Sequence, residues 1–204
     1  MIDYFALLNE PRRPWLDPDS LKKKFLTLSA EFHPDRVHGA KESEKEAAQK
    51  RYTELNSAYN CLRDHKLRLV HLLELERGSR PKEVQNVPAG LMDLFLRVRE
   101  VCQGADVFLA ERGDVDSPLL KVQMFERAQE ITEYLSKMQQ QINAWHEGLV
   151  ARLKEIDSAW DGTESEPAGN REGALHRIEE LYPLFSYFNR WTGQIQERIV
   201  QLSF

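Results

Sequence analysis

Apolar residues first recur at helical spacing over residues 17 to 34. Asp17 and Pro18 suit the N-cap and the first position of a helix, because the carboxylate accepts from free amides and proline has no amide to satisfy. Intervals of three and four residues put the apolar side chains on one face. This face comprises Leu21, Phe25, Leu28 and Phe32. Pro34 ends the predicted helix, because the residue before a proline avoids the helical conformation.

A second amphipathic helix is predicted after a polar turn over residues 33–41. Ser43 with Glu46 is typical of a capping box at its start, and apolar positions continue at helical spacing from there. Two helices with so short a connection are expected to pack antiparallel and to leave the turn in solvent. Asp64 can then cap a third, short helix that ends near Gly78.

A break in this periodicity divides the chain into two predicted domains. Glycine and proline residues interrupt the pattern over residues 77–88, so this stretch is predicted to be a linker. The first domain then covers residues 1–76 and the second covers residues 89–204. A chain of 204 residues is long enough for two small domains that each bury a core.

Three long apolar stripes make up the second predicted domain. They cover residues 91–109, 128–160 and 175–202, and turn signals separate them. Because stripes of this length must bury one another, they predict an antiparallel three-helix bundle. Pro183 lies inside the third stripe and is expected to kink or interrupt that helix. The fold class predicted for the whole chain is therefore all-α.

Composition and charge narrow the classes of function. The chain has 28 basic and 33 acidic residues and a net charge of -5, which argues against a nucleic-acid partner. The sequence has no run of about 18 apolar residues, so no membrane span is predicted. The first residues lack an export signal, so we expect a cytoplasmic protein. Cys61 and Cys102 lack the spacing of metal ligands, so neither a disulfide framework nor a metal site is predicted, and no cofactor is expected.

Catalysis is not predicted from either candidate pair of a histidine and a carboxylate residue. His33 and Asp35 share a loop in which no nucleophile or glycine-rich phosphate cradle is identifiable. His146 and Glu147 lack the second histidine of the HExxH zinc proteases. We therefore expect a protein that is not an enzyme.

The tripeptide His33-Pro34-Asp35, in the turn between the first two helices, is the most informative motif. With Asp3-Tyr4-Phe5 and the flanking helices, it resembles a J-domain over the predicted first domain. More narrowly, Asp3-Tyr4-Phe5 and Arg68-Leu69-Val70-His71 resemble the HscB-type co-chaperones of iron–sulfur cluster assembly. The segment Pro88-Ala89-Gly90-Leu91-Met92-Asp93 is similar to the one that opens their C-terminal three-helix bundle.

The resemblance implies a co-chaperone that stimulates the ATPase of a DnaK-type chaperone such as HscA. The residues that would trigger ATP hydrolysis are His33, Pro34 and Asp35. Those that would dock on the chaperone are Lys22, Lys23, Lys24 and Arg36. Leu26, Thr27 and Glu31 stand where general J-proteins commonly have basic residues, which favours a dedicated chaperone partner.

The resemblance also implies a second partner, an IscU-type iron–sulfur scaffold protein, bound by a face of the C-terminal bundle. The residues carried over to this face are Leu91, Met92, Phe95, Glu100 and Tyr182. Leu91 and Phe95 also fit the apolar stripe of the bundle itself, whereas Met92 lies off it and is the better candidate for an exposed contact. Any cluster would belong to the scaffold protein.

Two other interpretations of the whole chain stay open. The helical domain can recruit a client unrelated to iron–sulfur assembly, or the chain can be a helical adaptor in which the turn motif is inert. The oligomeric state is likewise open between a monomer and a weak dimer.

Overall fold

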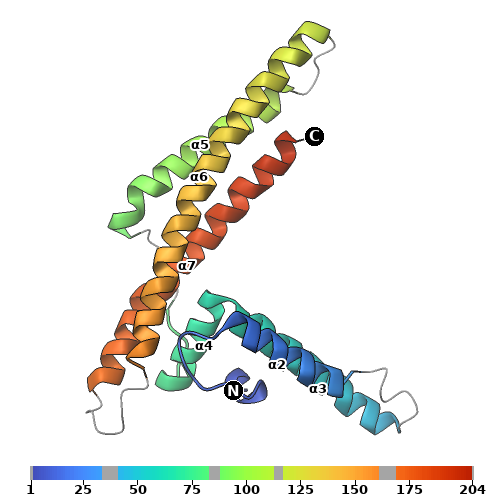
Figure 1. The fold of residues 1–204 in the computed structure, drawn as a ribbon, viewed down its shortest axis with the longest axis vertical. Helices are drawn as coiled ribbons and strands as arrows, with labels where there is room; N and C mark the ends of the chain where they lie inside the picture. Colours follow the sequence, from blue (N-terminus) through green and yellow to red (C-terminus); the bar gives the residue numbers. More distant parts are fainter. Residues whose placement is uncertain (1, 34–40, 83–87, 113–116, 161–168, 204) are drawn as a thin grey trace. The chain divides into compact units, whose positions relative to one another are not determined.

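The computed structural model describes residues 2–33, 41–82, 88–112, 117–160 and 169–203. All regular structure in these residues is helical, which confirms the all-α prediction (Figure 1). The elements in chain order are α1 (Tyr4–Leu7), α2 (Pro18–Glu31), α3 (Glu42–Arg63), α4 (His65–Arg77), the 3-10 turn η2 (Ala89–Leu91), α5 (Met92–Glu111), α6 (Pro118–Ser158) and α7 (Gly169–Leu202). None of the helices among these residues is both long and apolar enough to cross a bilayer.

The chain divides into two compact units. The first unit comprises Met1–Lys82 and Ala151–Tyr182, and the second comprises Glu83–Val150 and Pro183–Phe204. The long helices α6 and α7 therefore contribute to both units. The sequence did not indicate that residues 151–182 group with the N-terminal part, and the domain boundaries at 76 and 89 stay a prediction.

Local capping signals set most helix ends in the first unit. Asp17 Oδ1 accepts from the Ser20 amide at 2.8 Å, and Pro18 opens α2, as predicted. Asp64 caps α4 through the Leu67 amide at 2.8 Å, and Gly78 ends it in the left-handed conformation with φ 71°. These caps satisfy amides and carbonyls that a helix end otherwise leaves without partners.

The start of α3 differs from the prediction. The helix begins at Glu42, and the Glu44 carboxylate accepts from the Lys41 amide at 3.3 Å. The capping box predicted at Ser43 and Glu46 is therefore wrong by two residues. The error arises because several acidic residues near this helix start have the same capping chemistry.

The core of the first unit forms where α1, α2 and α4 each pack on α3. Its fully buried apolar side chains are Phe5, Leu8, Leu21, Leu55, Leu62, Leu69, Leu72 and Leu73. Each large side chain buried in this way stabilises the fold by about 1.5–3 kcal/mol. Between α2 and α3, the rings of Phe25 and Tyr59 stack with centroids 4.3 Å apart. The predicted helical hairpin is thus held along its length by apolar packing.

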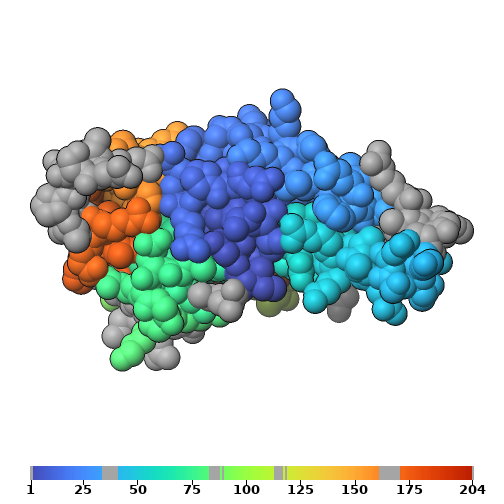
Figure 2. Space-filling view, turned by 90° about the horizontal axis from the view of Figure 1, so that it is seen from below, coloured from blue at the N-terminus to red at the C-terminus, as the bar shows by residue number. Residues whose placement is uncertain are grey.

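Polar contacts join the ends of α6 and α7 to the N-terminal residues of the first unit. Asp157 accepts from the Arg13 guanidinium at 2.7 Å and from the Trp15 amide at 3.0 Å. Arg77 of α4 forms a 2.9 Å ion pair with Glu172 of α7. Figure 2 shows the N-terminal residues, α4 and the start of α7 side by side on one face.

The second unit is a three-helix bundle of α5, the first part of α6 and the last part of α7 (Figure 1). Its buried side chains include Leu94, Val98, Ala105, Phe108, Leu135, Ile142, Phe185, Phe188 and Ile195. Pro183 was predicted to kink or interrupt the third helix; α7 continues through it, so the interruption does not occur and the kink stays a prediction. Burial of the neighbouring Tyr182 and Phe185 offsets the local preference of proline to end a helix.

Candidate functional site

The predicted trigger lies at the turn that joins α2 to α3. His33 follows the end of α2 and is exposed, whereas Pro34, Asp35 and Arg36 lie outside the described residues. The His33 ring meets the Tyr52 ring of α3 edge to face, with centroids 5.5 Å apart. The structure therefore places the first residue of the motif on the surface, against the helix that follows the turn.

Aromatic and cation–π contacts hold α2 and α3 together up to this turn. Beside His33 and Tyr52, the Arg51 guanidinium lies 5.8 Å from the centroid of the Phe32 ring. Further from the turn comes the stacked pair of Phe25 and Tyr59. Contacts of this kind contribute about 0.5–1.5 kcal/mol beyond their burial. They stiffen the end of the hairpin at which His33 lies.

The three predicted docking lysines have different surroundings. Lys22 and Lys23 are exposed on α2, and neither side chain forms an ion pair within the part of the chain that the structure describes. Lys24 Nζ instead lies 3.0 Å from a carboxylate oxygen of Glu10 and donates to the Asn9 carbonyl at 3.0 Å. Lys24 thus joins α2 to the N-terminal segment, and the accessible positive charge of these three comes mainly from Lys22 and Lys23.

A buried arginine, Arg68 of α4, holds the base of the hairpin in place. Its side chain is 2% exposed, and it donates to the carbonyls of Pro14 at 2.8 Å and Leu62 at 2.6 Å. A third bond goes to Nδ1 of His65 at 2.7 Å. Burial lowers the pKa of Arg68 to about 10, so the guanidinium stays charged at neutral pH. Because all its acceptors are in place, this charge ties the end of α3 to the segment before α2.

The N-terminal helix α1 is fixed to α4 by His71. Nε2 of this buried histidine accepts from the Tyr4 amide at 3.1 Å, and its ring stacks on Phe5 with centroids 5.9 Å apart. Burial lowers the pKa of His71, so the neutral ring that accepts this bond is favoured. Sequence reasoning did not identify Arg68 or His71 as positioning residues, although both stand in an otherwise apolar run of α4.

Asp3 completes the attachment of α1. Its carboxylate accepts from the Phe5 amide at 2.9 Å and from Arg12 Nε at 2.8 Å. Partial burial acts to raise the pKa of Asp3, but the hydrogen bonds from Arg12 and from the helix amides together hold it below its ordinary value. The motif Asp3-Tyr4-Phe5 thus has a structural role in capping and anchoring this helix.

The predicted scaffold-binding residues do not all lie together. Met92 is 41% exposed at the start of α5, whereas Leu91 is buried and Phe95 is half-buried near Trp191 of α7. Glu100 is exposed further along α5. Tyr182 belongs to the first unit, where it is 5% exposed and its hydroxyl donates to the Lys82 carbonyl at 2.6 Å. Its side chain therefore has little surface to offer a partner.

A shallow groove of about 310 Å³ lies beside the predicted scaffold-binding residues, between α5 and α7. Phe95 and Trp191 form an apolar part of its lining. Arg198 of α7 donates to Asp106 at 2.7 Å and to the Cys102 carbonyl at 3.2 Å. Two charged groups of this groove, Arg198 and Asp106, are thus already paired within the bundle, whereas Arg99, which also lines it, is exposed.

Thiol and metal chemistry find little support in the described residues. Burial raises the pKa of Cys61 to about 11 and also raises the pKa of Cys102, so both thiols stay protonated at neutral pH. No group of three or more potential metal-ligating side chains occurs in the described ranges.

Comparison with known proteins identifies the N-terminal part and the fold. Residues 3–71 match the family model of the DnaJ domain. The chaperone HscB from Vibrio cholerae shares the fold with a TM-score of 0.59 and 19% identity, covering 98% of this chain and 99% of that chain. The human co-chaperone protein HscB shares it with a TM-score of 0.59 and 17% identity, covering 98% of this chain and 81% of that chain. The predicted fold, a J-domain followed by a three-helix bundle, is confirmed.

Proposed function

We propose that this protein is a co-chaperone that stimulates ATP hydrolysis by a DnaK-type chaperone. This proposal is supported by the J-domain match over residues 3–71 in a chain with the HscB fold. The observation that carries this proposal is the packed α2–α3 hairpin with His33 exposed at its end. The motif residues His33, Pro34 and Asp35 would form the trigger. On this proposal, the ring of Pro34 restricts the backbone and the Asp35 carboxylate would accept from a basic surface on the partner.

The docking surface proposed for the chaperone is the exposed basic side of α2. Lys22 and Lys23 are exposed, Lys24 is held by Glu10 and would contribute less, and Arg36 would extend the surface beyond α2. Exposed ion pairs contribute only about 0.2–1 kcal/mol each, so a few of them give a weak and short-lived complex. Weak docking suits a co-chaperone that must leave after each cycle of hydrolysis.

We further propose that the second unit presents an IscU-type scaffold protein to the chaperone during iron–sulfur cluster assembly. Met92 and Leu96 are 41% and 51% exposed one turn apart on α5, which supports an apolar contact there. Glu100 follows one turn later and adds an acidic group on the same side. Leu91 and Phe95, which are more buried, would pack beneath these exposed side chains. Tyr182 is not included in the proposed scaffold-binding surface because it is buried.

A different client is the second candidate function. The scaffold-binding face that the resemblance implies combines apolar and acidic residues, whereas α5 here has the apolar Leu96 with the exposed Arg97 and Arg99 beside it. This part of α5 is therefore less acidic than an IscU-binding surface of the HscB type would be. A client without iron–sulfur chemistry but with an apolar contact and some acidic character would fit it equally well.

One experiment tests the proposed co-chaperone activity. Steady-state ATP hydrolysis by the cognate DnaK-type chaperone should rise several-fold when the protein is added, and the Asp35→Asn variant should leave it at the basal rate. Asp19→Asn, an exposed aspartate at the start of α2, is the matched control and should stimulate like the parent. Equal stimulation by the Asp35→Asn variant and the parent would contradict the trigger role.

The same assay separates the two clients. Adding IscU should raise the stimulation further, and Met92→Ser should remove this increment. Val107→Ser changes an equally exposed apolar residue of α5 and should keep the increment. If IscU neither binds nor raises stimulation by the parent, the iron–sulfur role is wrong and the general co-chaperone remains.

A further inference from the structure

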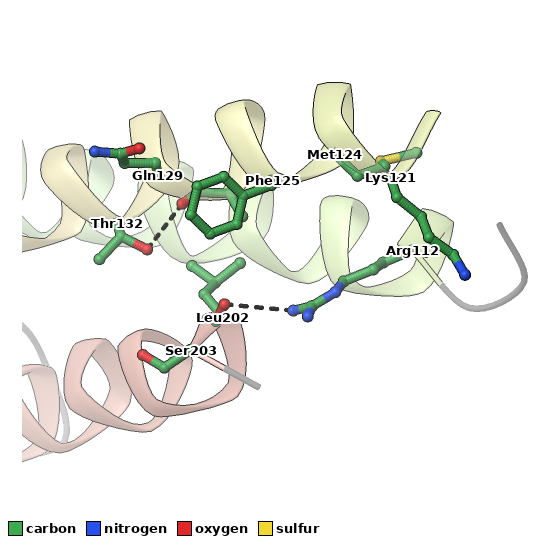
Figure 3. Close-up of a pocket in the computed structure, with 9 residues that line it drawn as sticks. Arg112, Lys121, Met124, Phe125, Gln129, Thr132, Leu202 and Ser203 are labelled. Atoms are coloured by element: carbon green, nitrogen blue, oxygen red, sulfur yellow. Dashed lines mark hydrogen bonds between the residues drawn. The ribbon is translucent and has the colours of Figure 1, made fainter. Parts of the chain in front are cut away.

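A second, larger groove lies in the second unit, between the start of α6 and the end of α7 (Figure 3). It has a volume of about 640 Å³. Of the described residues, nine line it: Arg112, Lys121, Met124, Phe125, Ala128, Gln129, Thr132, Leu202 and Ser203. It shares none of these residues with the proposed chaperone-docking or scaffold-binding surfaces, so the inference below does not depend on the proposed function.

The first turns of α6 expose several large apolar side chains, and one of them lines this groove. Phe125, in the lining, is 70% exposed, and three more large apolar side chains are exposed within the first turns of the helix. These are Leu119 at 68%, Leu120 at 47% and Val122 at 55%. Burying one such side chain is worth about 1.5–3 kcal/mol, and contiguous exposed apolar surface with a polar rim is typical of an interaction site.

The shape of the groove suits a helix. On α6 the lining residues recur at positions 121, 124, 125, 128, 129 and 132, which is one helical stripe about 16 Å long. The opposite wall is formed only by Leu202, the last residue of α7, and by Ser203, which follows it. Beyond that point the start of α6 lies beside the end of α5 without α7 (Figure 1). A helix about three turns long can therefore lie along this stripe where α7 does not reach.

The charge of the groove indicates the sign of the charge that its occupant carries. Among the lining residues that the structure describes, two are basic and none is acidic, although the chain as a whole carries a net charge of -5. Figure 3 shows Arg112 and Lys121 at the same end of the groove. Arg112 uses one donor on the Leu202 carbonyl at 3.3 Å, and Lys121 forms no ion pair with any residue that the structure describes. An occupant with acidic groups at this end would meet two cations and no carboxylate of the lining.

We propose that this groove binds an amphipathic helix of a partner protein, about three turns long, with an apolar face and acidic flanks. The apolar face lies on Phe125, Met124 and Leu202, and an acidic side chain near one end meets Arg112 and Lys121. This is the mode in which grooves between helices recognise helical segments, through residues spaced three and four apart.

The probe for this proposal is a pair of synthetic helical peptides, each about three turns long and labelled for fluorescence anisotropy. Both carry leucine on one face; one has glutamate on its flanks and the other lysine. The full-length protein should bind the glutamate peptide at least fivefold more tightly than the lysine peptide, because two rim cations attract one and repel the other. The preference should shrink as salt is raised.

Two variants locate the binding. Phe125→Ser removes the central exposed aromatic and should weaken binding of the glutamate peptide at least tenfold. Lys121→Glu should bring the affinities of the two peptides together or reverse their order. The matched control is Tyr134→Ser, which changes a 61% exposed aromatic of α6 outside the groove and should alter either affinity less than twofold. Circular dichroism confirms that each variant keeps its helices.

Three results would overturn the proposal. The first is equal affinity for the two peptides, and the second is unchanged binding by Phe125→Ser. The third is a dimer, seen by sedimentation equilibrium, that Phe125→Ser dissociates while the glutamate peptide does not compete with it. That last result would assign the groove to a second copy of this chain.

Discussion

Replacing Asp157 with alanine should destabilise the first unit by about 3 kcal/mol. The carboxylate is buried and accepts from Arg13 Nε at 3.0 Å, from Arg13 Nη2 at 2.7 Å and from the Trp15 amide at 3.0 Å. Hydrogen bonds to a charged group contribute about 1.5–3 kcal/mol each, and breaking a buried ion pair costs about 3–5 kcal/mol. The expected loss lies at the lower end because the Arg13 side chain is 29% exposed and regains water when its partner is removed.

The assay is urea denaturation combined with hydrogen exchange, because two units need not unfold in one step. Exchange at the Trp15 amide should speed up by about a hundredfold in Asp157→Ala, which corresponds to about 2.8 kcal/mol at about 1.4 kcal/mol per factor of ten. Asp106→Ala is the matched control: its ion pair with Arg198 is also 2.7 Å long, but the aspartate is 52% exposed. This control should cost less than about 1 kcal/mol.

A double-mutant cycle with Arg13→Ala then isolates the interaction energy between Arg13 and Asp157. The coupling between the two substitutions should exceed about 1 kcal/mol, because the residues contact each other directly. If Asp157→Ala costs no more than Asp106→Ala, the attachment of α6 to the N-terminal segment does not exist in solution. The account of the first unit as one packed body would then be refuted.

Three further predictions concern the J-domain. Burial holds the pKa of His71 below its ordinary value of 6.5, so the unfolded chain binds the proton more readily than the folded chain does. The free energy of unfolding should therefore be highest above about pH 6.5 and fall as the pH drops through the folded pKa. Urea denaturation at pH 7 and pH 5 should show a smaller fall in the free energy of unfolding for His71→Gln than for the parent. Gly78→Ala, at φ 71°, should lower the melting temperature through a cost of about 1 kcal/mol, whereas Gly104→Ala inside α5 should not. Lys22→Gln should weaken apparent chaperone affinity in the ATPase assay more than Lys24→Gln does, because Glu10 already holds Lys24; equal effects would contradict this difference.

Local signals in the sequence account for the elements that were predicted correctly. Asp17 with Pro18 and Asp64 with Gly78 each act within a few residues, so their chemistry can be recognised without knowledge of the fold. The start of α3 was misplaced because the acidic side chain used for capping, Glu44, has close neighbours of the same type. Local chemistry of this kind predicts that a helix begins but not always at which residue.

Contacts between distant residues could not be predicted in the same way. Asp157 and Arg13 are 144 positions apart, and nothing local distinguishes either from the other charged residues of the chain. Tyr182 was expected on a binding surface, yet it is buried because the start of α7 packs in the first unit. Pro183 shows the reverse effect, since burial of the residues around it keeps α7 continuous where the local rule predicts a break.

The measurement that most directly tests the central claim is single-turnover ATP hydrolysis by the cognate DnaK-type chaperone, titrated with this protein and with its His33→Gln variant. His33 is exposed at the end of the hairpin, so the substitution should leave the fold intact. We predict that the hydrolysis rate rises and saturates with the parent protein and stays at the basal value with the variant. Identical titration curves for the two proteins would show that the turn does not trigger hydrolysis.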